Sequence, residues 1–141
     1  MQEKQPLSMA AAMEAERRAI VQAPPPKKSG LTVPRVFSRT GVQPFDELEW
    51  KRCTAEITDD AGKVIFRQEN IEAPQDWSVP ATKVVVSKYF YGENGTAERE
   101  QSVKQLIHRV TRTIADWGKA DGYFASEKDA EVFYNELTCC A

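Results

Sequence analysis

The most regular hydrophobic pattern in the chain lies in SVKQLIHRVTRTIADWG, residues 102–118. At 100° per residue its apolar side chains fall within an arc of about 100°, the width of one buried helix face. Ser102 and Gln105 have the spacing of a capping box, and Gly118 stands where a helix often ends. The pattern predicts a long amphipathic helix that buries Val103, Leu106, Ile107, Val110, Ile114 and Trp117.

A second amphipathic helix is predicted from Ser126, which has the character of an N-cap, to about residue 138. Its apolar stripe consists of Ala130, Phe133, Tyr134 and Leu137. Because the connection KADGYFA is short, we expect the two helices to pack as an antiparallel pair. Their two stripes would make only a thin core.

Strand-like alternation precedes these helices. The stretch WKRCTAEI, residues 50–57, places Cys53, Ala55 and Ile57 on one face. The turn TDDAG follows, and then KVIFRQ, in which Val64 and Phe66 can face the same side. This pattern predicts a β-hairpin, which must pack on another element to be stable in water.

The stretch DWSVPATKVVVSKYFYG admits two interpretations. Three consecutive valines favour a strand, whereas Ser78 before Val79-Pro80 has the character of a helix cap with proline in the first turn. Since Ala81, Val84, Val85 and Lys88 have helical spacing, a helix over about 79–90 is favoured. The expected fold class is therefore α+β, a hairpin followed by amphipathic helices.

The first thirty residues differ from the rest. An Ala-, Glu- and Arg-rich segment that could form a frayed helix is followed by QAPPPKKSG, a proline-rich linker with little to bury. Proline-rich runs can dock on aromatic grooves, but this one lacks a surrounding motif. We expect residues 1–30 to be a disordered tail and residues 31–141 to be the domain.

The charge and composition of the chain limit the classes of partner that we expect it to bind. The 141 residues include 19 Lys and Arg against 21 Asp and Glu, a net charge of -2, which predicts no nucleic-acid or anionic-lipid partner. No apolar run approaches the roughly 20 residues of a membrane span, and charges interrupt the amino-terminal segment where a secretory signal would be apolar. Three cysteines without framework spacing suit a reducing compartment, so the expected location is the cytoplasm.

Candidate polar chemistry is sparse. Lys104, His108 and Arg112 form a basic stripe that could meet an acidic surface or a phosphate, although a solvated face is favoured. The GENGT loop, residues 92–96, lacks the glycine spacing of a phosphate loop and is expected to be a turn. The acidic cluster Asp46, Glu47 and Glu49 lacks partners for metal binding or acid–base catalysis.

The cysteines are also poor catalytic candidates. Cys139 and Cys140 are adjacent, so a disulfide between them would close a strained ring, and a redox pair normally has the C-x-x-C spacing. Zinc would need further ligands that the neighbouring sequence does not supply. Cys53 lies in the predicted hairpin. We therefore predict no catalytic, cofactor-binding or metal-binding residue in this chain.

Several stretches together resemble one family. SRTGVQPFDELEWKR, WSVPATKVVVSKYFYG, SVKQLIHRVTRTIADWG and GYFASEKDAEVFYNELT are similar, in this order, to the amino-terminal region of the adenosylcobalamin (vitamin B12)-dependent, class II ribonucleotide reductases. The similarity covers about residues 31–138. It carries family markers but none of the family's catalytic motifs.

The resemblance implies a role in reducing ribonucleotides to deoxyribonucleotides for DNA synthesis, with ribonucleoside diphosphates as the expected substrates. In that family a thiyl radical, generated with adenosylcobalamin, acts on the substrate inside a ten-stranded α/β barrel, and the resembling region is a preamble to this barrel. The implied cofactor is adenosylcobalamin, with its site outside this chain. The implied partner is the remainder of the reductase barrel or a reductase chain.

After NELT the family continues towards an Asn-Ser-Pro segment that opens the barrel, whereas this chain reads CCA. No cysteine here aligns with a catalytic one. We therefore expect an N-terminal fragment, truncated at its carboxyl end and inactive alone, whose two final helices expose apolar stripes that the barrel would cover. The alternative is a free-standing interaction or regulatory module that uses the 102–117 helix to bind a protein.

Overall fold

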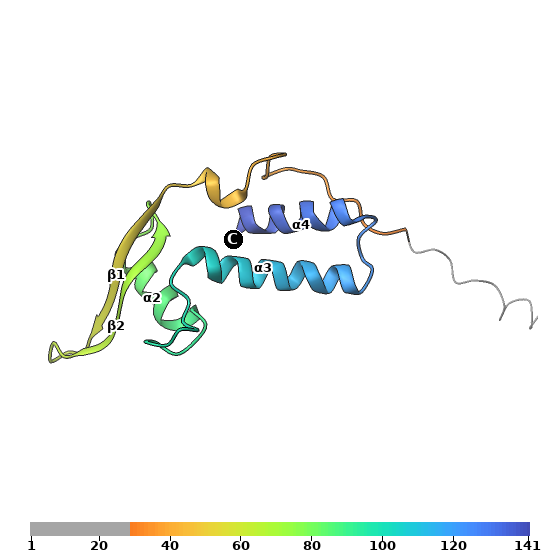
Figure 1. Cartoon of the computed structure of the whole chain (residues 1–141). Coiled ribbons are helices and arrows are strands. Elements are labelled where there is room, and N and C mark those ends of the chain that lie inside the picture. Colours follow the sequence, from red (N-terminus) through yellow and green to blue (C-terminus); the bar gives the residue numbers. More distant parts are fainter. Residues whose placement is uncertain (1–28) are drawn as a thin grey trace, which may run out of the picture.

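The computed structural model describes residues 29–141. A two-stranded hairpin stands at one end of the molecule, and a pair of antiparallel helices extends to the other (Figure 1). The predicted α+β class is confirmed. Residues 1–28, which include most of the predicted tail, lie outside the described residues. The elements in order are η1 (Pro44–Glu47), β1 (Trp50–Thr58), β2 (Val64–Pro74), α2 (Val79–Tyr89), α3 (Val103–Ala120) and α4 (Glu127–Cys140).

The hairpin of β1 and β2 is confirmed, with Ile57 opposite Phe66 as the alternation predicts. Strand β2 continues beyond the predicted KVIFRQ stretch to Pro74. The extension passes through a bulge, because Cys53 pairs with Ile71 whereas Ala55 pairs with Gln68. The extra residue on β2 lets Gln68 and Ile71, three apart, both be buried.

Helix α2 packs on the hairpin and is confirmed close to its predicted bounds. The hydroxyl of Ser78 accepts a hydrogen bond from the backbone N–H of Ala81 at 3.3 Å. The buried side of α2, however, carries Thr82 and Val86, whereas Val84 is 53% exposed. The predicted apolar stripe therefore does not coincide with the side of α2 that packs on the hairpin. With three consecutive valines, the sequence alone does not show which side is buried. The core is completed by Ala55, Ile71, Ala73, Phe90 and Val103.

Helix α3 begins with the predicted capping box of Ser102 and Gln105. The prediction that Gly118 ends it is wrong, because the helix continues to Ala120. Gly122, with φ of 72°, supplies the left-handed residue instead, and the Tyr123 N–H donates to the Gly118 carbonyl at 2.9 Å. Gly118 is a contact residue: a Cβ there would lie 2.8 Å from the Phe124 ring.

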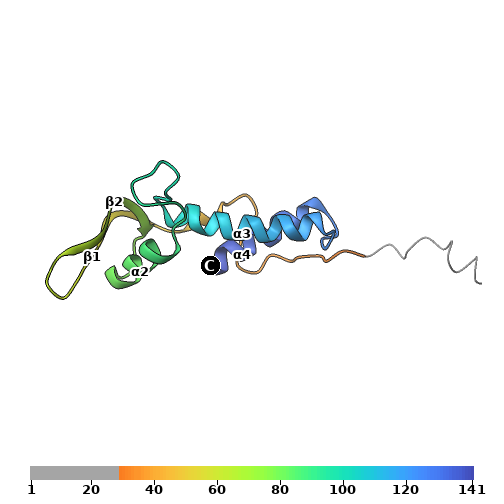
Figure 2. The ribbon, with the colours of Figure 1, turned by 90° about the horizontal axis from the view of Figure 1, so that it is seen from below.

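Helix α4 starts at the predicted Ser126 cap and runs antiparallel to α3, which confirms the predicted pair (Figure 1). Its buried side chains include Val132, which the predicted stripe omitted. The extended segment 31–38 accounts for this, because it runs alongside α4 (Figures 1 and 2). Its Val33 N–H donates to Asp129 at 3.0 Å. Val132 lies on the same side of the helix as Asp129.

Candidate functional site

The carboxyl-terminal half of α3 exposes apolar side chains. Val110, Ile114 and Trp117 are 43%, 38% and 65% exposed. The prediction that these three belong to a buried face is therefore wrong. The reason is that α4 packs on the neighbouring side of α3, where Thr111 and Ala115 are buried. The expectation of exposed apolar stripes on both final helices holds for α3 alone, because Ala130 and Tyr134 of the α4 stripe are buried.

The exposed stripe continues into an apolar groove of about 380 Å³. Leu31 forms a parallel bridge with Phe124, and its N–H donates to the Tyr123 carbonyl at 2.7 Å. This bridge fixes the amino-terminal segment beside the end of α3. We call the resulting surface the α3 apolar face; it consists of Leu31, Val110, Ile114, Trp117 and Tyr123.

The α3 apolar face suits docking better than catalysis. The polar groups of its side chains are the Tyr123 hydroxyl and the Trp117 N–H. Contiguous exposed apolar patches of this kind mark interaction sites in proteins. None of the helices within residues 29–141 has both the length and the apolarity needed to cross a membrane.

The basic stripe on α3 is engaged inside the molecule, so the prediction of a solvated face is wrong. Lys104 Nζ lies 3.3 Å from Glu72, and His108 Nδ1 lies 2.7 Å from the Tyr134 hydroxyl. The Arg112 guanidinium stacks 3.8 Å from the centre of the Tyr134 ring. The stripe faces the hairpin and α4, which sequence periodicity alone could not assign.

Arg112 also forms an ion pair with Glu131, its Nη2 atom lying 3.0 Å from Oε1. The hydrogen bond from Arg112 lowers the pKa of Glu131, and the carboxylate in turn raises the pKa of Arg112. The pair therefore stays charged over the ordinary pH range. It joins α3 to α4 and presents no free cation to a phosphate.

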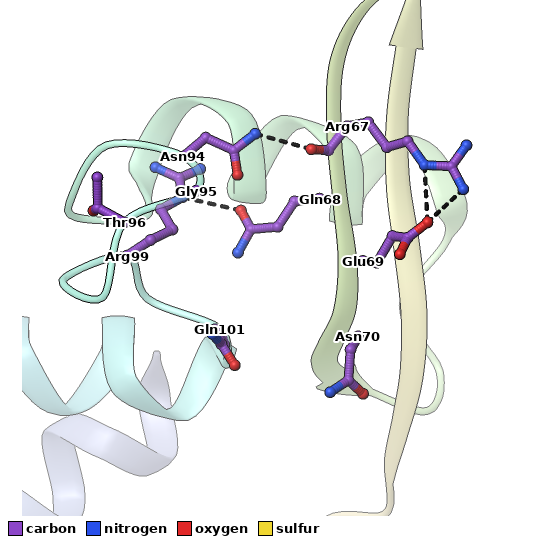
Figure 3. Close-up of a pocket in the computed structure, with 9 residues that line it drawn as sticks. All are labelled: Arg67, Gln68, Glu69, Asn70, Asn94, Gly95, Thr96, Arg99 and Gln101. Atoms are coloured by element: carbon purple, nitrogen blue, oxygen red, sulfur yellow. Dashed lines mark hydrogen bonds and ion pairs between the residues drawn. The ribbon is translucent and has the colours of Figure 1, made fainter.

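A polar hollow of about 610 Å³ lies between β2 and the 92–101 loop (Figure 3). The loop begins with the predicted turn, in which the Thr96 N–H donates to the Glu93 carbonyl at 3.1 Å. Both arginines of the hollow are occupied by internal partners. Arg67 binds Glu56 at 2.7 Å, and Arg99 binds Gln68 at 2.9 Å. The hollow thus has no unpaired arginine to hold an anion.

The cysteines are free thiols in the structure. Cys139 is half-buried, and this burial raises its pKa, which disfavours the thiolate needed for nucleophilic or redox chemistry. Cys140 is exposed and Cys53 lies in β1. Within residues 29–141 no group of three His, Cys, Asp or Glu side chains is placed to hold a metal. Of the acidic cluster, Glu47 pairs with Arg39 at 3.5 Å.

The described residues do not fit cobalamin. The single histidine that could approach a cobalt ion, His108, bonds to Tyr134 between two helices. In the polar hollow beside β2, Arg99 bonds to Gln68 and Arg67 bonds to Glu69. No step of a cobalamin reaction is assigned to residues 29–141 on this structure.

Comparison with known proteins gives a consistent result. A family model described as class II vitamin B12-dependent ribonucleotide reductase matches residues 51–95 and 91–140. The vitamin B12-dependent ribonucleotide reductase of Rhodopirellula baltica is 56% identical over 99 residues, which are 70% of this chain and 10% of that protein. The protein of the same name from Streptomyces coelicolor is 47% identical over 109 residues, 77% of this chain and 11% of that protein.

A third relative, the vitamin B12-dependent ribonucleotide reductase of Bradyrhizobium diazoefficiens, is 28% identical over a 141-residue alignment that covers 76% of this chain. The chain spans about a tenth of the length of these relatives. The matched region contains the hairpin and all three helices α2 to α4. The chain belongs to the family of class II vitamin B12-dependent ribonucleotide reductases.

Proposed function

We propose that this chain is the amino-terminal region of a reductase that converts ribonucleoside diphosphates to deoxyribonucleotides for DNA synthesis. Residues 31–141 form the domain, and residues 1–30 are a tail. The support is the family match over residues 51–140 together with the small share of each relative that the chain covers. On this proposal the adenosylcobalamin site and the radical chemistry belong to the remainder of the reductase.

The role of the region itself is to dock, and it contributes no catalytic residue. The observation that carries this proposal is the α3 apolar face, with Trp117 65% exposed on a helix whose other sides are packed or polar. Burying this face would remove a continuous apolar surface from water, which favours association. The occupant that we propose is the remaining polypeptide of the reductase.

The direct test is an assay of the purified chain with adenosylcobalamin, a ribonucleoside diphosphate and a dithiol. We expect no deoxyribonucleotide above a protein-free blank, whereas the Rhodopirellula baltica reductase serves as the positive control. Nucleotide-dependent turnover by the chain alone would overturn the proposal. Replacement of Cys139 and Cys140 by serine would then show whether a thiol of this chain is responsible.

A second candidate is a free-standing module that binds another protein without catalysis. The same exposed stripe on α3 favours it, because a helix with an uncovered apolar side is suited to partner binding. A pull-down with the purified chain separates the two candidates. A stable complex with a reductase polypeptide supports the first, and a stable complex with an unrelated protein supports the second.

A further inference from the structure

The rest of the described molecule covers one outer edge of the hairpin and leaves the other open. The sheet has only two strands, so each strand has one edge that no strand covers. Unpaired strand edges carry free N–H and C=O groups and are templates for pairing with another chain. Whether an edge is covered therefore decides whether it can bind.

The outer edge of β2 is covered. The Asn94 side chain donates to the Arg67 carbonyl at 2.8 Å, and the Glu72 N–H donates to the Gln101 carbonyl at 2.9 Å. Figure 3 shows the 92–101 loop on one side of β2 and β1 on the other. These contacts occupy β2 along much of its length.

The outer edge of β1 is open. Within residues 29–141, the hydrogen bonds of the β1 backbone go to β2 alone. Arg52 and Thr54 are exposed, and Glu56 is half-buried on the same side of the strand. Figure 1 shows β1 along the outside of the molecule, away from the helix pair. A two-stranded ribbon is marginal in water and gains stability from a further strand.

The charges along this edge are self-complementary. If a second copy of β1 pairs antiparallel with Thr54 opposite Thr54, Arg52 of each copy lies directly opposite Glu56 of the other. Directly opposite residues share one face of the sheet, and opposite charges there are stabilising. We propose that β1 is an interface at which two copies of this chain join their hairpins into one four-stranded antiparallel sheet.

The intramolecular ion pairs of these residues are compatible with this arrangement. Arg52 reaches Glu72 at 3.8 Å with 60% of its side chain exposed, and Glu56 reaches Arg67 at 2.7 Å with 36% exposed. Each therefore has surface left for a second, intermolecular partner. The antiparallel register turns the two copies end to end, so that their helix pairs extend from opposite ends of the joined sheet.

Charge reversal tests the interface. Sedimentation equilibrium of the full chain is run over a concentration series for the wild type, Arg52→Glu and Glu56→Arg. Each single reversal places two like-charged pairs across the sheet and should raise the dimer dissociation constant by about tenfold or more. Lys88→Glu on α2 is the matched control, with the same change of charge on another element, and should leave the dimer intact.

Mixing the two variants gives the decisive result. An Arg52→Glu copy opposite a Glu56→Arg copy restores both opposite-charge pairs, so the mixture should form a heterodimer although neither variant pairs with itself. This recovery also shows that both variants are folded. A monomeric wild type at every concentration overturns the proposal, and so does a dimer that is insensitive to both reversals, which would place the contact elsewhere.

Discussion

At the scale of single residues, Glu136 does most to join the amino-terminal segment to α4. Its carboxylate accepts hydrogen bonds from the backbone N–H groups of Phe37 and Ser38, each at 2.8 Å, from that of Val36 at 3.0 Å, and from the Ser38 hydroxyl. These donors hold the pKa of Glu136 at about 2, well below its ordinary 4.5. The segment is thereby tied to the helix that it covers.

Glu136→Gln should make the chain less stable and remove part of its pH dependence. Because the folded pKa is depressed, the contribution of Glu136 is fully present above pH 4.5 and is lost as the pH falls towards about 2. Urea titrations of wild type and variant should therefore differ most near neutral pH and converge in acid. Glu93→Gln, on the exposed 92–96 turn, is the control. A difference that is constant with pH would contradict this account.

Local residue signals were predictable from sequence, and long-range ones were not. The caps at Ser78, Ser102 and Ser126 follow from side chains that bond to backbone two or three residues away, so a short window contains the whole interaction. The contact of Glu136 with Ser38 joins residues 98 apart, and nothing local marks it. The prediction that Gly118 ends α3 failed because this glycine instead makes room for the Phe124 ring. That contact depends on the turn that follows the helix.

At the scale of elements, Arg99 holds the end of α2 against the hairpin. Its guanidinium donates to the carbonyls of Val86, Phe90 and Gly92 at 2.6, 2.8 and 2.9 Å. It also donates to Gln68 of β2 at 2.9 Å. Burial lowers the pKa of Arg99, and each nitrogen atom of its guanidinium donates at least one of these hydrogen bonds. One side chain thus satisfies the open carbonyls of a helix end and reaches the neighbouring strand.

Arg99→Lys should destabilise the chain by about 1–3 kcal/mol, because an ammonium group cannot reproduce the planar fork and leaves helix-end carbonyls without a donor. Equilibrium urea unfolding measures the change. Arg67→Lys, in the same hollow but paired at the surface with the carboxylates of Glu56 and Glu69, should have a much smaller effect. Equal effects of the two substitutions would show that the contacts of Arg99 add nothing beyond those of a surface arginine.

The hairpin and helices α2, α3 and α4 were predicted from strand alternation, capping residues and helical spacing, whereas the short helix η1 was not predicted. The packed faces were less predictable. In the carboxyl-terminal half of α3 the apolar side is the exposed one, since α4 packs on a side that includes Thr111 and Ala115. The β2 bulge was missed because Asn70, with φ of 55°, looks like any polar strand residue in sequence.

At the scale of the whole molecule, the central feature is a folded region with an uncovered apolar surface. The core is formed by the hairpin, α2 and the start of α3, and the helix pair extends beyond it (Figures 1 and 2). The far end of that pair carries the α3 apolar face. If the chain docks on the rest of a reductase through this face, as we propose, changing the face alone should weaken that assembly.

A chimeric reductase provides the most direct test. Residues 31–140 replace the matching tenth of the Rhodopirellula baltica protein, and deoxyribonucleotide formation is measured with and without Trp117→Glu. If Trp117 is buried where the region docks, replacing it with a charged residue should weaken docking and lower turnover by about tenfold or more. Because Trp117 is 65% exposed in the isolated chain, the same substitution should leave the fold of that chain intact.

The control is Tyr89→Glu, an aromatic residue on α2 that is 60% exposed and lies outside the α3 apolar face. The account predicts an active parent chimera, an active Tyr89→Glu chimera and a Trp117→Glu chimera that has lost most of its turnover. A Trp117→Glu chimera as active as its parent would contradict the claim that this face docks on the reductase.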